Sequence, residues 1–270
     1  MAGLQLGEIW IYPIKSLGGI RVKSAKVFQK GLEYDRRWML IDRDNDFMTQ
    51  RIYPKMALFK LQLQSRWWLG SKFKITHGKD SILLSPHHSC LSKPIKAVIW
   101  DDEVEVYEVD EKYSAWFTKH LGIECKLVSF PERNARPVDQ KYQINHEQVG
   151  LADAYPLLLI GEQSLADLNS RLEEPVPMNR FRPNLVVHGS QAYEEDGWKN
   201  FSVGKNKFAA VKPCARCVLT TVNQNTGEKG AEPLATLSKY RKQDNKVLFG
   251  QNLIAIDHDE IHEGDEIILE

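Results

Sequence analysis

The sequence predicts a mainly β protein of the α+β class with few short helices. Many short runs of β-branched and aromatic residues are separated by turn residues, and few segments show the periodicity of a helix. This combination is typical of β-barrels and sandwiches rather than of alternating β-α-β units. The chain has 270 residues, so it can bury a large core as one domain or as two smaller ones.

The first half consists mostly of predicted strands separated by turns such as 17–19, 44–46 and 78–80. We expect strands at Ile9–Tyr12, Val22–Phe28, Trp38–Ile41, Phe73–Thr76, Ile82–Ser85, Ala97–Trp100, Val104–Val109 and Glu124–Phe130. The clearest helix is expected at Glu111–Leu121, because four apolar residues fall on one side of it and Gly122 can end it.

A change in composition separates the two halves. Residues 131–141 are polar and include two prolines, which indicates a linker or a ligand-facing loop. We therefore expect two domains, 1–130 and 131–270. In the second half we expect a helix at Gly161–Leu172 and strands at Leu157–Ile160, Leu185–Val187, Val218–Val222 and Ile267–Leu269.

Composition and charge argue against several classes of protein. Lys plus Arg equals Asp plus Glu at 36 each, so the basic footprint of a duplex-binding protein is missing and no nucleic-acid partner is expected. The sequence has no run of about 18 apolar residues that would predict a membrane span, and its N-terminus does not resemble a secretory signal. Four cysteines do not suggest a disulfide scaffold, so we expect a soluble protein of the reducing cytoplasm with no membrane partner.

The most informative segment contains Cys214 and Cys217, with Arg216 between them. A thiolate beside a cation is either a metal ligand or a nucleophile. A structural zinc site needs two further ligands, and neither Cys90 nor Cys125 has a close partner in the sequence. The sequence therefore favours one thiolate that serves a soft metal, with Arg216 balancing its charge.

Two other interpretations, a redox motif at Cys214 and Cys217 and a metal site at a pair of histidines, are weaker. A thioredoxin-type motif should open a helix, whereas Val218–Val222 has the character of a strand. His258 and His262 have the spacing of a chelating pair on a helix, but they lie between predicted strands and favour a solvated turn.

Several basic residues form candidate anion sites. Lys15 and Ser16 end a strand at a Gly-Gly turn, where an ammonium, a hydroxyl and backbone N–H groups suit an anion. Arg36 precedes one predicted strand, and Arg182 and Asn184 precede another. Arginine suits phosphate and the polar edges of heterocycles, although each of these residues taken singly is more often a surface residue.

Taken together, these segments resemble one family. The motifs are residues 12–16 (YPIKS), 35–38 (DRRW), 164–172 (SLADLNSRL), 179–184 (NRFRPN) and 214–222 (CARCVLTTV), in the same order as in MOSC-domain proteins that carry an N-terminal MOSC β-barrel domain. The motifs are similar to those of the mitochondrial amidoxime-reducing component and its bacterial counterparts, and the resemblance extends from Glu8 to about Leu269. It implies a MOSC β-barrel domain at 131–270 packed with the N-terminal MOSC β-barrel domain at 1–130.

The resemblance also implies a molybdenum cofactor, in which a pterin dithiolene holds molybdenum and a protein cysteine is a further ligand. The matching pattern makes Cys217 this metal ligand and the catalytic cysteine. The remaining residues that the pattern assigns to the pterin and its phosphate are Lys15, Ser16, Arg36, Ser164, Arg182, Asn184 and Arg216.

The implied activity is the reduction of N-hydroxylated compounds, namely amidoximes, hydroxylamines and N-hydroxylated bases. The sequence has no cysteine after Cys217 and no Gly-x-Gly-x-x-Gly turn, so we expect electrons from a separate flavin or iron–sulfur protein. Two alternatives stay open: a molybdenum-cofactor carrier or sulfur-transfer protein, and a zinc-binding structural protein that uses Cys214 and Cys217. The sequence departs from some relatives at Ala215 and Asn252.

Overall fold

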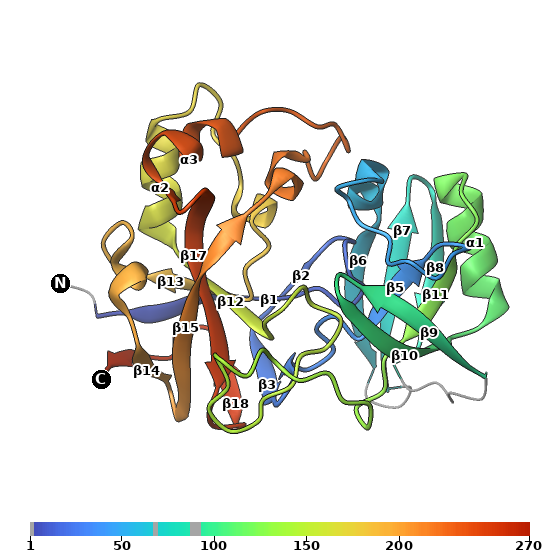
Figure 1. Ribbon diagram of the computed structural model, residues 1–270, viewed down its shortest axis with the longest axis horizontal. Coiled ribbons are helices and arrows are strands. Elements are labelled where there is room, and N and C mark those ends of the chain that lie inside the picture. Colours follow the sequence, from blue (N-terminus) through green and yellow to red (C-terminus); the bar gives the residue numbers. More distant parts are fainter. Residues whose placement is uncertain (1–2, 67–69, 87–92) are drawn as a thin grey trace.

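The computed structural model describes residues 3–66, 70–86 and 93–270, and strands dominate them (Figure 1). The strands of the first half are β1 (Gln5–Ile11), β2 (Ile20–Val22), β3 (Ser24–Phe28), β4 (Gly31–Leu32), β5 (Trp38–Ile41), β6 (Lys60–Arg66), β7 (Gly70–His77), β8 (Asp80–Leu84), β9 (Pro94–Ile99), β10 (Asp102–Glu108) and β11 (Lys126–Ser129). Those of the second half are β12 (Leu157–Gly161), β13 (Leu185–His188), β14 (Asn200–Val203), β15 (Asn206–Arg216), β16 (Lys242–Gln243), β17 (Lys246–Ala255), β18 (Glu260–His262) and β19 (Ile267–Leu269). The mainly β prediction is confirmed.

Helices are few and short, as expected. The α-helices are α1 (Glu111–Leu121), α2 (Glu162–Ser170) and α3 (Leu234–Tyr240), and the 3-10 helices are η1 (Pro54–Leu58), η2 (Met178–Arg180), η3 (Glu194–Gly197) and η4 (Val218–Thr221). The bounds of α1 match the prediction, because the Asp110 carboxylate caps Lys112 N at 3.0 Å and Gly122 ends the helix with φ +71°.

The largest sheet has nine strands in the order β19-β14-β15-β17-β12-β13-β1-β2, with β16 paired to β17. Strands β12 and β13 are parallel, and the other pairs of this sheet are antiparallel. The first half contributes a four-stranded sheet, β5-β11-β10-β9, and a three-stranded sheet, β6-β7-β8, while β18-β3-β4 forms a third small sheet. The chain therefore begins with two strands that complete the sheet of the second half.

Figure 1 shows two lobes side by side. One lobe holds the nine-stranded sheet, and the other holds the sheets β5-β11-β10-β9 and β6-β7-β8. The two lobes share one core. A single cluster of buried apolar residues runs from Leu6 and Ile9 on β1, through Phe59 and Phe117 of the first half, to Phe208 of the second half. The 1–130 and 131–270 boundary stays a prediction, because β1 and β2 pair with the second half of the chain although they lie in the first.

The expected strand at Val218–Val222 is wrong: β15 ends at Arg216, and the 3-10 helix η4 follows. The reason is local, because two threonine hydroxyls bond backward to main-chain carbonyls. Thr220 Oγ1 donates to Cys217 O at 3.0 Å, and Thr221 Oγ1 donates to Val218 O at 2.8 Å. These bonds compete with a strand ladder despite the β-branched composition.

Gly250 allows β17 to pass close to β12. Its φ is +81°, and an added Cβ would lie 2.6 Å from Ile160 Cγ1 and 2.7 Å from the Leu159 carbonyl oxygen. Gly264 has φ +90° but nothing within 4 Å of an added Cβ. The two positions therefore share the same backbone constraint and differ in steric space.

We predict that Gly250→Ala lowers the free energy of unfolding more than Gly264→Ala does. Both substitutions incur about 1–2 kcal/mol for a left-handed alanine, and the overpacking at Gly250 adds about 1–3 kcal/mol. Urea unfolding followed by circular dichroism measures the difference. Equal losses in the two variants would contradict the close approach of β17 to β12.

Candidate functional site

A cavity of about 520 Å³ draws its lining from both halves of the chain. It brings together seven of the eight predicted cofactor residues: Lys15, Ser16, Arg36, Arg182, Asn184, Arg216 and Cys217. Backbone hydrogen bonds hold the contributing segments together. Lys15 N donates to Trp38 O at 2.8 Å, and Asn184 N donates to Leu158 O at 2.8 Å.

Ser164 lies elsewhere. It is fully buried at the start of α2, and its hydroxyl is 2.8 Å from both carboxylate oxygens of Glu195. The same hydroxyl accepts a hydrogen bond from Tyr193 N at 2.8 Å. Its contacts hold η3 against α2, and the structure does not bring it to the cavity.

The lining is strongly cationic. Seven lysine or arginine side chains line the cavity and only two carboxylates, Asp153 and Asp244, do so. The whole chain has a formal net charge of zero. The charge is therefore segregated, and the cavity is suited to an anionic ligand.

Three of the predicted residues have left-handed backbone conformations: Ser16 with φ +65°, Arg36 with φ +49° and Arg182 with φ +56°. Such conformations cost about 1–3 kcal/mol each for residues other than glycine. They persist where the surrounding structure fixes them, commonly at binding sites. At this site they direct two guanidinium groups and a hydroxyl-bearing residue toward one cavity.

The guanidinium groups of Arg36 and Arg182 both lie against the Tyr12 ring, at 4.4 and 4.2 Å from its centroid. Arg36 Nη1 donates to Asn184 Oδ1 at 3.0 Å, and Arg182 Nη1 donates to the carbonyl of Leu17 at 2.6 Å. Burial lowers the pKa of Arg182 to about 10. Both guanidinium groups are held in fixed orientations before any ligand binds.

The thiol of Cys217 contacts Arg51, which sequence reasoning missed. Arg51 Nε lies 3.1 Å from Cys217 Sγ, and Arg51 Nη2 lies 2.6 Å from Asp153 Oδ2. The other oxygen of Asp153 accepts from Lys15 Nζ at 2.6 Å. The structure therefore contains a polar chain that runs from Cys217 through Arg51 and Asp153 to Lys15.

Charge and burial act in opposite directions along this polar chain. Burial lowers the pKa of Lys15 to about 8, although Asp153 opposes the shift. Burial would raise the pKa of Asp153, yet Lys15 and Arg51 hold it well below its usual range. Arg51 is 166 residues from Cys217 in the chain and belongs to none of the motifs, so no sequence signal indicated this contact.

Arg216 contacts the other thiol, which corrects its expected role as the partner of the metal-binding cysteine. Its Nη1 lies 2.9 Å from Cys214 Sγ, and its Nη2 donates to the Phe181 carbonyl at 2.5 Å. The buried Nε of Arg216 has no hydrogen-bond partner among the described residues. Each cysteine of the pair therefore has its own guanidinium.

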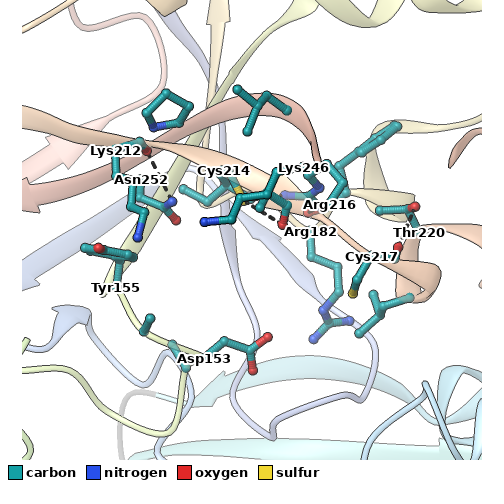
Figure 2. Close-up of a pocket in the computed structure, with 18 of the residues that line it drawn as sticks. Asp153, Tyr155, Arg182, Lys212, Cys214, Arg216, Cys217, Thr220, Lys246 and Asn252 are labelled. Atoms are coloured by element: carbon teal, nitrogen blue, oxygen red, sulfur yellow. Dashed lines mark hydrogen bonds between the residues drawn. The ribbon is translucent and has the colours of Figure 1, made fainter. Parts of the chain in front are cut away.

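Figure 2 places Cys217 and Thr220 at one end of the cavity and Lys212, Tyr155 and Asn252 at the other. The polar segment after β11 contributes Tyr142 and residues 152–155 to the lining. The lining therefore begins just after residues 131–141, the segment for which the sequence predicts a linker or a ligand-facing loop.

The zinc alternative has little support in the described residues. They contain no group of three or more His, Cys, Asp or Glu side chains that could hold a metal ion. Cys125 is buried, with its thiol 3.7 Å from Thr118 Oγ1, and Cys90 lies outside the described residues. His262 ends β18 instead of a helix. Within the described ranges, no helix is long and apolar enough to span a bilayer.

Comparison with known proteins identifies two family domains in the chain. The MOSC N-terminal beta barrel domain matches residues 3–124, and the MOSC domain matches residues 146–268. Mitochondrial amidoxime-reducing component 1 of Homo sapiens is 32% identical, over 98% of this chain and 82% of that protein. The Mus musculus protein of the same name is 34% identical, over 91% of this chain and 74% of that protein.

A third relative is the molybdenum cofactor sulfurase of Oryza sativa, which is 32% identical over 98% of this chain. The chain spans only 34% of that longer protein. The order of the two domains and the near-complete coverage of the chain agree with the family expected from the motifs. The chain therefore belongs to the MOSC-domain proteins that carry the MOSC N-terminal beta barrel domain, a family associated with the molybdenum cofactor.

Proposed function

We propose that this protein binds the molybdenum cofactor in the cationic cavity and reduces N-hydroxylated compounds with electrons from a separate protein. The observation that carries the proposal is the Cys217 thiol, paired with Arg51, at one end of a cavity lined by seven cations. The names of the amidoxime-reducing relatives support the choice of substrate class. We place the protein in a reducing compartment such as the cytoplasm, because the three described cysteines are free.

The residues of the cavity fit this cofactor chemically. A thiolate is a soft ligand, which suits a metal already bound by dithiolene sulfur. The excess of cations offsets the charge of an anionic pterin phosphate. The buried Arg216 Nε has no acceptor among the described residues, so a bound heterocycle or phosphate oxygen could satisfy it.

Each part of the cavity then has a distinct task. Cys217 would ligate the metal, and Arg51, with its Nε 3.1 Å from the sulfur, would hold this side chain in place. Arg36 and Arg182, fixed against Tyr12, would bind the polar edge of the pterin. Neither task requires these side chains to reorganise, which favours tight retention of the cofactor.

The cofactor, when bound, would supply the two-electron reduction of the N–O bond. In the overall reaction an amidoxime takes up two electrons and two protons and yields an amidine and water. Lys15 lies in the cavity with a pKa of about 8, so it can hold or release a proton near neutral pH. The electrons come from a flavin or iron–sulfur donor protein.

A carrier or sulfur-transfer protein is the second candidate. The rice molybdenum cofactor sulfurase aligns with 98% of this chain, and a carrier would use the same cationic cavity. Turnover of an N-hydroxylated substrate distinguishes the two functions, because only the reductase releases a reduced product.

We predict that Cys217→Ala abolishes molybdenum binding and activity, whereas Cys214→Ala leaves both largely intact. The reason is that one thiolate completes the metal coordination and only Cys217 belongs to the polar chain that contains Arg51 and Asp153. The measurement is elemental analysis of protein purified from a host that makes the cofactor. Stoichiometric zinc without molybdenum would revive the zinc alternative, and a requirement for Cys214 alone would exchange the roles of the two cysteines.

We further predict that the molybdenum-loaded protein converts benzamidoxime to benzamidine with reduced viologen, but not with NADH alone. Cys217→Ala protein serves as the matched control, because it should lose the metal while retaining the fold. Chromatographic quantification of benzamidine measures the outcome. Loaded protein that accepts electrons yet reduces none of several N-hydroxylated compounds would favour the carrier.

A further inference from the structure

An apolar patch adjoins the Cys217 end of the cavity. Among the described residues nine large apolar side chains are exposed, and three of them, Ile52, Trp100 and Val218, belong to this patch. Ile52 directly follows Arg51 in the chain. Val218 directly follows Cys217, whose Sγ is 3.1 Å from Arg51 Nε. Exposed apolar side chains gathered beside a polar cavity commonly mark a ligand-binding surface.

Trp100 is the member of this patch with an unusual backbone conformation. Strands β9 and β10 pair at Ile99 and Asp102, so Trp100 and Asp101 form the two-residue turn of their hairpin. Trp100 has φ +56° at the first turn position, which glycine often occupies in two-residue hairpins. A bulky residue in the left-handed region is an outlier, and strain of this kind gathers at functional sites.

Two contacts hold the side chain of Trp100 beside the thiol of Cys217. The guanidinium carbon of Arg51 lies 4.7 Å from the centroid of the Trp100 ring, and Phe47 meets the same ring edge to face at 5.2 Å. Because Arg51 Nε also contacts Cys217 Sγ, the indole is one guanidinium away from the thiol. Trp100 is nevertheless 49% exposed, so part of its ring is open to a ligand.

We propose that Trp100, with Ile52 and Val218 beside it, forms a subsite for the aryl group of the substrate and sets a preference for aromatic substrates. This inference rests on the proposed function in one respect: the ligand is the N-hydroxylated substrate, whose N–O group enters the cavity at Cys217. The indole stacks on a neutral planar ring, and the aryl group is removed from water. None of the three apolar residues lines the cavity itself, so the subsite selects the substrate without holding the cofactor.

The first experiment measures binding to cofactor-loaded full-length protein without an electron donor. NMR titration compares benzamidoxime with acetamidoxime, which carries a methyl group in place of the phenyl group. Native protein should bind benzamidoxime more tightly, and Trp100→Gly should lower the ratio of the two affinities about threefold to tenfold, the value of one aromatic contact. Trp100→Phe should retain most of the preference. The matched control is Phe28→Ala, because Phe28 is also an exposed aromatic residue but lies on β3.

The second experiment tests whether Trp100 is merely structural. Glycine adopts φ +56° without strain, so the urea midpoint of Trp100→Gly should not fall below that of native protein. A lower midpoint with an unchanged affinity ratio would make Trp100 a structural residue and overturn the subsite.

Two further outcomes of the titration would also overturn the subsite. Native protein could bind the two amidoximes equally or bind neither, or Trp100→Gly could lose affinity for both to the same extent, which would mean that the indole acts only through Arg51. Binding requires no electrons, so a failure of loaded protein to reduce amidoximes would refute the proposed reductase and leave the affinity ratio as a separate result.

Discussion

The guanidinium of Arg51 joins the two halves of the chain at the thiol of Cys217, because its Nε lies 3.1 Å from Sγ while its Nη2 pairs with Asp153 at 2.6 Å. A largely buried arginine requires partners for its donors, and the sulfur of Cys217 and the carboxylate of Asp153 supply them. The position of Cys217 therefore depends on how the lobes pack, not only on the strand that carries it. Neither half alone contains the complete cavity lining.

Gln50, which directly precedes Arg51 in the chain, forms a buried pair with Gln224. Gln50 Nε2 donates to Gln224 Oε1 at 3.2 Å, and Gln224 Nε2 donates to Gln50 Oε1 at 2.8 Å. Gln50 also donates to the carbonyl of Ser16 at 2.7 Å, and Lys229 Nζ donates to the carbonyl of Arg51 at 2.5 Å. Buried polar groups that satisfy each other specify one arrangement of the two halves. The same contacts link a predicted anion-site residue, Ser16, to the segment that follows Cys217.

Local patterns in the sequence predicted local structure well and long-range contacts poorly. The bounds of α1 follow from a local helical pattern that Gly122 ends. Lys15, Arg182 and Cys217 were expected at one site because their motifs resemble those of a family, and all three line the cavity. Arg51 could not be predicted in this way, since its partner is 166 residues away. The strand expected at Val218–Val222 failed because composition favours β structure while threonine hydroxyls bond backward. Ser164 belongs to a matching motif, yet Glu195 holds it inside the second lobe.

The cavity concentrates unfavourable energy that an anionic ligand would relieve. Three residues in left-handed conformations surround it, seven cations repel one another across it, and burial lowers the pKa values of Lys15 and Arg182 to about 8 and 10. The shared apolar core and the Gln50–Gln224 pair hold this arrangement in place before any ligand binds. An anion that neutralises the cations binds only the folded chain, so it stabilises the fold by mass action. The preorganised site therefore lowers the stability of the fold without a ligand, and the binding of an anion restores part of that stability.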